Sequence, residues 1–185
     1  GIACGAGAIG TAFTAVPFVS SFAPSERAKA AGAAVEVDIS ALKPGQMQTV
    51  EWRGKPVWIV RRTPEQVASL KKTDSQVADP KSQRNPGELT PEYARNEHRS
   101  RKPEILVAVG ICSHLGCSPS AKLEAGAQPS LPDDWQGGFF CPCHGSTFDL
   151  AGRVYKNKPA PDNLEVPPHM YLSDNRLIIG EDKKA

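Results

Sequence analysis

Apolar and polar residues alternate from residue 35 onward with a period of two, which is typical of β-strands with one buried face. Val35, Val37 and Ile39 alternate with charged or hydroxyl side chains. After a KPGQ turn at residues 43–46, two extended runs flank Arg-Gly-Lys at residues 53–55, as in a β-hairpin. The pattern therefore predicts a strand followed by a hairpin.

The later part of the chain continues this β pattern. EILVAVGI at residues 104–111 is a nearly continuous apolar run of strand length, which indicates a buried central strand. Residues 118–138 predict a loop, and residues 147–155 predict two short strands around an Ala-Gly turn. MYLSDNRLIIG predicts a closing hairpin across Ser173 to Asn175. With seventeen prolines and sixteen glycines, the chain is expected to form a mainly β, turn-rich domain rather than a helical bundle.

One helix and one irregular stretch interrupt the predicted strands. Residues 63–72 predict a short helix with Thr63 as N-cap, a proline at the first helical position and Gln66 placed to complete a capping box. Residues 73–103 are polar and contain four prolines, so we expect an exposed excursion. His98 lies in this stretch and is expected to be solvated.

The N-terminal residues 1–22 carry no charged side chain. A helix of this length, at about 1.5 Å per residue, would just cross a hydrocarbon core of about 30 Å. We therefore predict a transmembrane anchor helix, with the core of a removed signal peptide as the alternative. Gly1 and Gly5 have the GxxxG spacing that lets another helix approach closely. Cys4 is interpreted as a small apolar residue rather than a ligand, and the true N-terminus is expected upstream.

The rest of the chain divides into a tether and a head. Residues 23–34 are small or polar without an apolar stripe, which predicts a flexible tether or, alternatively, a short helical extension of the anchor. Residues 35–185 form the predicted head domain, and the length of 185 residues suits one domain with an appendage. The net charge of +2 is mild and the basic residues are scattered, so nucleic-acid binding is excluded.

Two short boxes carry the candidate chemistry: CSHLGC, which begins at Cys112, and CPCHGS, which begins at Cys141. They contain four of the five cysteines and two of the four histidines. Cys112 and His114 lie two apart and point to the same side of an extended segment. Cys141 and His144 can converge across a tight turn. The boxes therefore predict a shared metal centre.

On spacing alone a mononuclear zinc site stays open, although zinc usually prefers CxxC and HxxxH spacings and would leave two cysteines without a role. Together, however, the two boxes resemble the signature of the Rieske iron–sulfur proteins. The resemblance implies an antiparallel β-sandwich or barrel head with an inserted cluster-binding subdomain at about residues 110–161. It also implies a [2Fe-2S] cluster and a disulfide between Cys117 and Cys143. The implied iron ligands are Cys112 and Cys141 on one iron and His114 and His144 on the other.

The anchor, the tether and the segment KPAPDNLEVP resemble the Rieske subunits of ubiquinol–cytochrome c reductase, respiratory complex III. This resemblance implies a subunit that takes one electron, with proton coupling, from ubiquinol and passes it to a c-type cytochrome. The implied partners are a cytochrome b subunit and a membrane c-type cytochrome. Because disulfides persist in oxidising compartments, the implied location is the bacterial inner membrane, single-pass, with the head in the periplasm. The small Rieske subunit of arsenite oxidase and a zinc-stabilised, membrane-tethered module are the alternatives.

The resemblance also implies roles for residues close to the cluster. The quinol-facing, proton-coupled position is assigned to His144, with His114 as the alternative. Leu115 and Gly116 are expected to form an apolar lip where a quinone ring could dock. Ser146 is expected to donate a hydrogen bond to a cluster sulfide, which stabilises the reduced form.

Two positions depart from the family pattern. Many relatives have a tyrosine, which donates a hydrogen bond to a ligand sulfur, where this chain has Phe148, so we expect a lower reduction potential. Pro159 and Pro161 belong to the implied proline loop beside the cluster, and Lys158 replaces a frequent glycine before it. His169 is expected to be structural or on the surface and is given no role.

Overall fold

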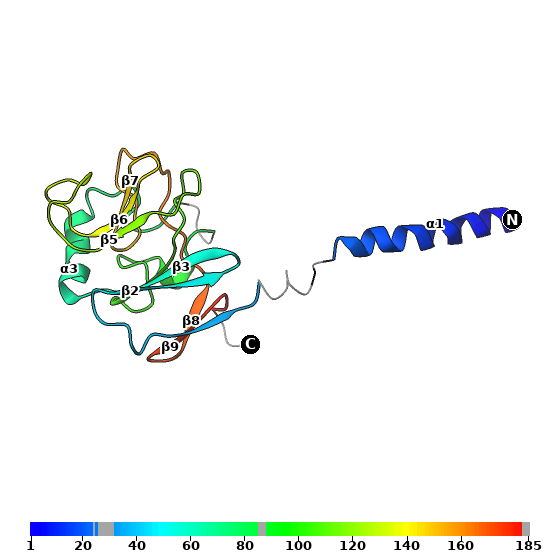
Figure 1. Cartoon of the computed structure of the whole chain (residues 1–185), viewed down its shortest axis with the longest axis horizontal. Helices are drawn as coiled ribbons and strands as arrows, with labels where there is room; N and C mark the ends of the chain where they lie inside the picture. Colours follow the sequence, from blue (N-terminus) through cyan, green and yellow to red (C-terminus); the bar gives the residue numbers. More distant parts are fainter. Residues whose placement is uncertain (24, 26–31, 85–87, 183–185) are drawn as a thin grey trace. The chain divides into compact units, whose positions relative to one another are not determined.

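A computed structural model describes residues 1–23, 25, 32–84 and 88–182. The chain divides into two units, Gly1–Ala33 and Ala34–Ala185 (Figure 1). Most of the predicted tether, residues 23–34, lies outside the described residues, and so does the side chain of Cys4.

The N-terminal unit contains one helix, α1 (Ile2–Ser21). Its hydroxyl groups donate to backbone carbonyls of the preceding turn, as Thr11 does to Gly7 at 2.9 Å. Phe13 and Phe18 are largely exposed. The predicted helix is confirmed, but among the described residues no helix is both long enough and apolar enough to span a membrane. The expected transmembrane span is not met, because glycine, alanine and hydroxyl residues dilute the large apolar side chains.

The head is mainly β, as predicted, and contains three small antiparallel sheets of three strands each. In Figure 1 the sheet β5-β6-β7 lies at one end of the head and the strands β8 and β9 at the other. The first sheet has the order β1-β9-β8, from Val35–Asp38, Arg176–Ile179 and His169–Ser173. The second has the order β2-β3-β4, from Met47–Trp52, Lys55–Arg61 and Ile105–Val109. The third has the order β5-β6-β7, from Ser120–Lys122, Gly138–Cys141 and Ser146–Asp149.

Strand β4 of the sheet β2-β3-β4 is buried along its whole length, which explains why it is an almost continuous apolar run. Successive side chains of a strand point to opposite faces. Ile59 and Val107 pack in one core with Leu177 of β9. Trp58 and Leu106 face a second core. The cysteine boxes and the strands next to them also contribute to this second core, through Cys112, Phe139, Cys141 and Phe148.

The predicted hairpins and helix are confirmed. The last hairpin pairs β8 with β9 across Ser173 and Arg176. The helix is α3 (Pro64–Thr73), in which the Thr63 hydroxyl accepts from the Gln66 N–H at 3.2 Å and the Gln66 side chain accepts from the Thr63 N–H at 2.9 Å. This reciprocal pair is a capping box, which satisfies two donors at the helix start.

Three expectations were wrong in part. The loop predicted for residues 118–138 contains β5, a strand too short to show a period. The second strand predicted after the Ala-Gly turn consists of two isolated bridges, Val154 with Phe148 and Tyr155 with Val77. The stretch 73–103 includes the short 3-10 helix η1 (Glu92–Ala94) and is partly buried rather than exposed. Arg99 in this stretch is fully buried, because its polar groups find internal partners.

Candidate metal centre

The first cysteine box is a closed loop that follows β4. Gly110 marks the exit from the strand, where an added Cβ would lie 2.3 Å from the Trp58 ring. The Cys112 N–H donates to the Cys117 carbonyl at 2.8 Å, and the Gly116 N–H donates to the Cys112 carbonyl at 3.1 Å. Gly116 has a φ of +81°, a conformation that favours glycine. The loop therefore brings both of its cysteines to one place.

The second box is the turn of the hairpin between β6 and β7. Cys141 pairs with Ser146 at the end of the ladder. The Gly145 N–H donates to the Cys141 carbonyl at 2.9 Å, and Gly145 has a φ of +75°. The residues between them, including His144, are thus forced into a tight turn at the edge of the head. His144 is exposed.

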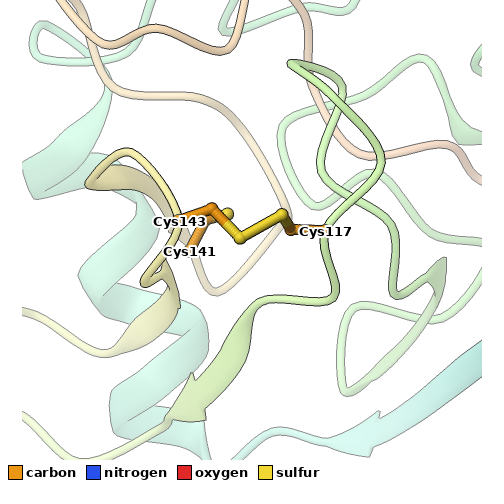
Figure 2. Close-up of side chains that lie close together, drawn as sticks. All are labelled: Cys117, Cys141 and Cys143. Carbon is orange, nitrogen blue, oxygen red and sulfur yellow. A yellow bond between two sulfur atoms is a disulfide. The ribbon is translucent and has the colours of Figure 1, made fainter.

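A disulfide between Cys117 and Cys143 joins the two loops, as predicted, with a Cα–Cα distance of 6.7 Å (Figure 2). The sulfur atoms of this pair and of Cys141 lie within 4.8 Å of one another. A cysteine in a disulfide has no thiolate to offer, so we do not treat these three as a ligand set. Cys112 and Cys141 are the free cysteines of the site, and both are buried.

The two histidines of the boxes face each other. The rings of His114 and His144 lie 4.6 Å apart between centroids, at 88° to each other. The Nδ1 atom of His114 is buried and has no hydrogen-bond partner among the described residues. A buried polar atom without a partner costs about 1–3 kcal/mol, which a metal bond would remove. The atom is therefore free to act as a ligand.

The free thiols fit the same interpretation. Burial raises the pKa of the Cys112 thiol, and the backbone near His114 and the Ser146 hydroxyl partly offset this. A metal ion displaces the proton, because the ligand form of cysteine is the thiolate. The site therefore fits an iron–sulfur cluster. It offers two buried thiols and an unpartnered imidazole nitrogen, and its disulfide is not needed for ligation.

The segment after β7 closes over the boxes through two serine hydroxyls. Ser146 Oγ accepts from the Ala160 N–H at 3.0 Å, and its hydroxyl also interacts with the Cys112 thiol. Ser113 Oγ donates to the Asp162 carbonyl at 2.6 Å. The proline loop, residues 158–163, is thus tied to both boxes. Ser113 was not anticipated from the sequence, because a serine hydroxyl on a loop carries no pattern.

The remaining predicted site residues lie either on the exposed surface around the two boxes, which we call the tip, or in the core. Leu115 is 71 % exposed, and Gly116, Pro159 and Pro161 are also exposed. In contrast, Phe148 is fully buried in the second core beside Cys112 and Cys141. The exposed set gives the tip an apolar character, with Leu115 as its largest side chain.

The two histidines outside the boxes do not reach the site. His169 is buried, its Nδ1 lies 2.8 Å from the Pro167 carbonyl, and its ring packs edge-on against Tyr93. Burial lowers the pKa of His169 to about 4. The prediction that His98 is solvated was wrong, because its side chain is only 20 % exposed and its Nε2 lies 3.2 Å from Glu97.

Comparison with known proteins agrees with this chemistry. A model of the Rieske [2Fe-2S] domain matches residues 89–168. The "Ubiquinol-cytochrome c reductase iron-sulfur subunit" of Allochromatium vinosum is 56% identical over 177 residues, which cover 96% of this chain and 84% of that protein. "Cytochrome b-c1 complex subunit Rieske-1, mitochondrial" of Nicotiana tabacum is 42% identical over 149 residues, 80% of this chain and 48% of that protein. The chain thus spans about half the length of this plant relative.

A chain from the solved structure titled "Hyperthermophilic respiratory Complex III" is 26% identical, with a TM-score of 0.49 over 96% of this chain and 99% of that chain. The two joined loops and the family model define the class, a protein with a Rieske-type [2Fe-2S] cluster. Within that class, the chain belongs to the iron–sulfur subunits of ubiquinol–cytochrome c reductase. Subunits of this family carry electrons from ubiquinol to cytochrome c, and the zinc and arsenite oxidase alternatives have no support.

Proposed function

We propose that Cys112 and Cys141 bind one iron of the cluster and that His114 and His144 bind the other. The observation that carries the proposal is the convergence of two free buried cysteines and two facing histidine rings on loops joined by a disulfide. When bound, the cluster supplies a one-electron acceptor whose potential is raised by its two neutral imidazole ligands.

His144 is the proposed docking point for ubiquinol. It is exposed at the turn of its box, whereas His114 is half-buried. The outer nitrogen of the His144 ring accepts a hydrogen bond from the quinol hydroxyl and then holds its proton. The exposed Leu115 side chain, with Gly116, offers an apolar surface for the quinone ring. Recognition thus combines one polar contact with burial of an apolar ring.

Two residues behind the ligands tune the site. The Ser146 oxygen is held by the Ala160 N–H beside the Cys112 thiol, and we propose that its O–H donates to a cluster sulfide. Phe148 is fully buried and has no donor to offer. We expect Ser146 to raise the reduction potential of the cluster. We expect Phe148 to leave the reduction potential below that of relatives with tyrosine at this position.

The location and partners follow from the same proposal. We propose that the subunit is attached to the bacterial inner membrane through packing of α1 against partner subunits, with the head in the periplasm. A helix with few large apolar side chains gains more from close packing against partner helices than from lipid alone, and α1 carries Gly5 at GxxxG spacing from Gly1. The proposed partners are a cytochrome b subunit and a membrane c-type cytochrome.

Single substitutions of the four proposed ligands test this assignment. Cys112→Ser, Cys141→Ser, His114→Gln and His144→Gln in the full chain should each abolish the EPR signal of the reduced protein and its bound iron. Leu115→Ala is the matched control on the same loop, because it should keep the signal while slowing ubiquinol oxidation about tenfold or more, the scale of a lost positioning contact. A ligand variant with unchanged iron content and signal would contradict the assignment.

A further inference from the structure

A hollow of about 340 Å³ opens beside the proline loop. Its lining contains three cationic side chains and no acidic one. The cations are Arg84, Lys156 and Lys158, and the other lining residues are Ala78, Tyr155, Asn157, Ala160 and Pro161. The whole chain has a net charge of only +2, so this surface holds more positive charge than the protein as a whole.

Neutral groups, rather than carboxylates, hold two of these cations in place. The Arg84 Nη1 donates to the Pro161 carbonyl at 2.9 Å, and the Lys156 Nζ donates to the Ser75 carbonyl at 2.7 Å. Lys158 is exposed and forms no ion pair among the described residues. Carbonyl oxygens orient a cation without cancelling its charge. The hollow therefore keeps a positive potential.

Two acidic residues lie close to the hollow in the sequence, and neither lines it. Asp79 is buried and accepts from the backbone N–H groups of Gln83 and Arg84 at 2.9 Å each. Asp162 is half-buried and directly follows Pro161 in the sequence. Asp79 lowers the potential of the hollow in part, and so does Asp134, whose charge acts on the lining residue Tyr155. The three cations lie in the lining itself, whereas these carboxylates do not.

The hollow is positioned where a partner of the cluster would meet it. Ala160 is a wall of the hollow and also donates to Ser146 in the second box. Asp162, two residues later, is bonded to Ser113 in the first box. A standard protein interface buries about 800 Å² on each partner. Because the proline loop connects the hollow to both boxes, an interface of this size that covers the boxes can extend to the hollow.

We propose that this basic hollow binds carboxylates on the acidic surface of the c-type cytochrome that accepts the electron, a proposal that rests on the proposed function. Ubiquinol has no charge and would gain nothing from the three cations. An electron acceptor is met transiently, and such encounters gain most from electrostatic steering. The Arg84 guanidinium is suited to a carboxylate, because its N–H groups match the two oxygens.

The test compares electron transfer from the reduced full-length holoprotein to the purified cytochrome c subunit of the complex in a stopped-flow instrument. The variant carries Arg84→Gln, Lys156→Gln and Lys158→Gln. At low ionic strength its second-order rate should be about tenfold lower than wild type, and the two rates should converge as salt is added. Lys71→Gln, an exposed lysine of α3 outside the hollow, removes one charge and should leave both the rate and its salt dependence unchanged.

Several results separate the possibilities. The reduced-state EPR signal and the potential must match wild type in all variants, so that a slower rate reports docking and not the cluster. An unchanged rate and salt slope in the triple variant would overturn the proposal while leaving the proposed function intact. Loss of binding to phosphatidylglycerol vesicles, with an unchanged electron-transfer rate, would overturn it in favour of lipid headgroups. The absence of an EPR signal from the reduced wild-type protein would instead contradict the proposed function.

Discussion

The head has two parts that are stabilised in different ways. The frame, formed by the sheets β1-β9-β8 and β2-β3-β4, surrounds an apolar core in which Val57, Ile59 and Val107 are completely buried. The cluster unit is formed by β5-β6-β7 and the loops at residues 110–119 and 150–164. Its strands have only three or four residues, whereas the frame contains strands of six and seven residues. It relies on a disulfide and on buried polar groups instead. Short strands bury too little apolar surface to fix loops that must hold a metal site.

Buried arginines show the difference most clearly. Arg99 is fully buried and its guanidinium donates to carbonyls of Ala151, Gly152 and Leu164. Arg153 is buried with Asp149, which directly follows Phe148 in β7. These cations bind the turn after β7 to the stretch 73–103. The cluster unit is therefore stabilised by buried charged groups, and the loss of one partner lowers the free energy of unfolding strongly. The frame is stabilised by many small apolar contacts instead.

The largest effect is expected from breaking the buried ion pair of the cluster unit. Arg153→Leu leaves the Asp149 carboxylate buried without its partner, and we expect a loss of about 3–5 kcal/mol in the free energy of unfolding. Arg176→Leu is the matched control, because Arg176 pairs with Glu36 on the surface of the frame and should cost less than about 1 kcal/mol. Urea unfolding measures both. Equal losses in the two variants would remove the distinction between the parts.

The disulfide should follow in size. Cys117→Ser with Cys143→Ser opens a covalent link across 26 residues, and a loop of this length predicts a loss of about 3 kcal/mol. The same double variant should lose bound iron before the frame unfolds, as seen by comparing iron absorption with far-UV circular dichroism during heating. Simultaneous loss of both signals would show that the two parts are one cooperative unit.

A third prediction concerns pH and the frame. Burial lowers the pKa of His169 to about 4 in the folded protein, against about 6.5 in an unfolded chain. The unfolded state therefore takes up the proton first, so stability is complete above pH 6.5 and falls as the pH drops toward 4. The loss should reach about 2 kcal/mol at pH 5. His169→Phe keeps the ring contact with Tyr93 and should flatten this slope, and an unchanged slope would argue against the buried histidine.

The smallest effects should separate function from stability. Phe148→Tyr in the cluster unit should raise the reduction potential in protein-film voltammetry, because a phenol can donate to a ligand sulfur. Ile59→Val in the frame should cost about 1 kcal/mol of stability and leave the potential unchanged. A lower or equal potential in the tyrosine variant would contradict the assigned effect of Phe148.

The sequence pattern predicted the frame better than the cluster unit for a physical reason. Apolar periodicity marks β4 and the hairpins, and the capping box at Thr63 is local in sequence, so both could be predicted. The disulfide could be predicted only from the family resemblance of the boxes. The burial of Arg99 and the role of Ser113 depend on partners more than 45 residues away, and β5 is too short for a period. Long-range polar contacts leave no local pattern.

Pulsed EPR on the reduced, full-length protein tests the central claim most directly. If His114 and His144 bind one iron of a [2Fe-2S] cluster, the spectrum contains couplings to two histidine nitrogens. An iron–sulfur signal without nitrogen couplings, or purified protein that contains zinc and no EPR signal, would contradict the account.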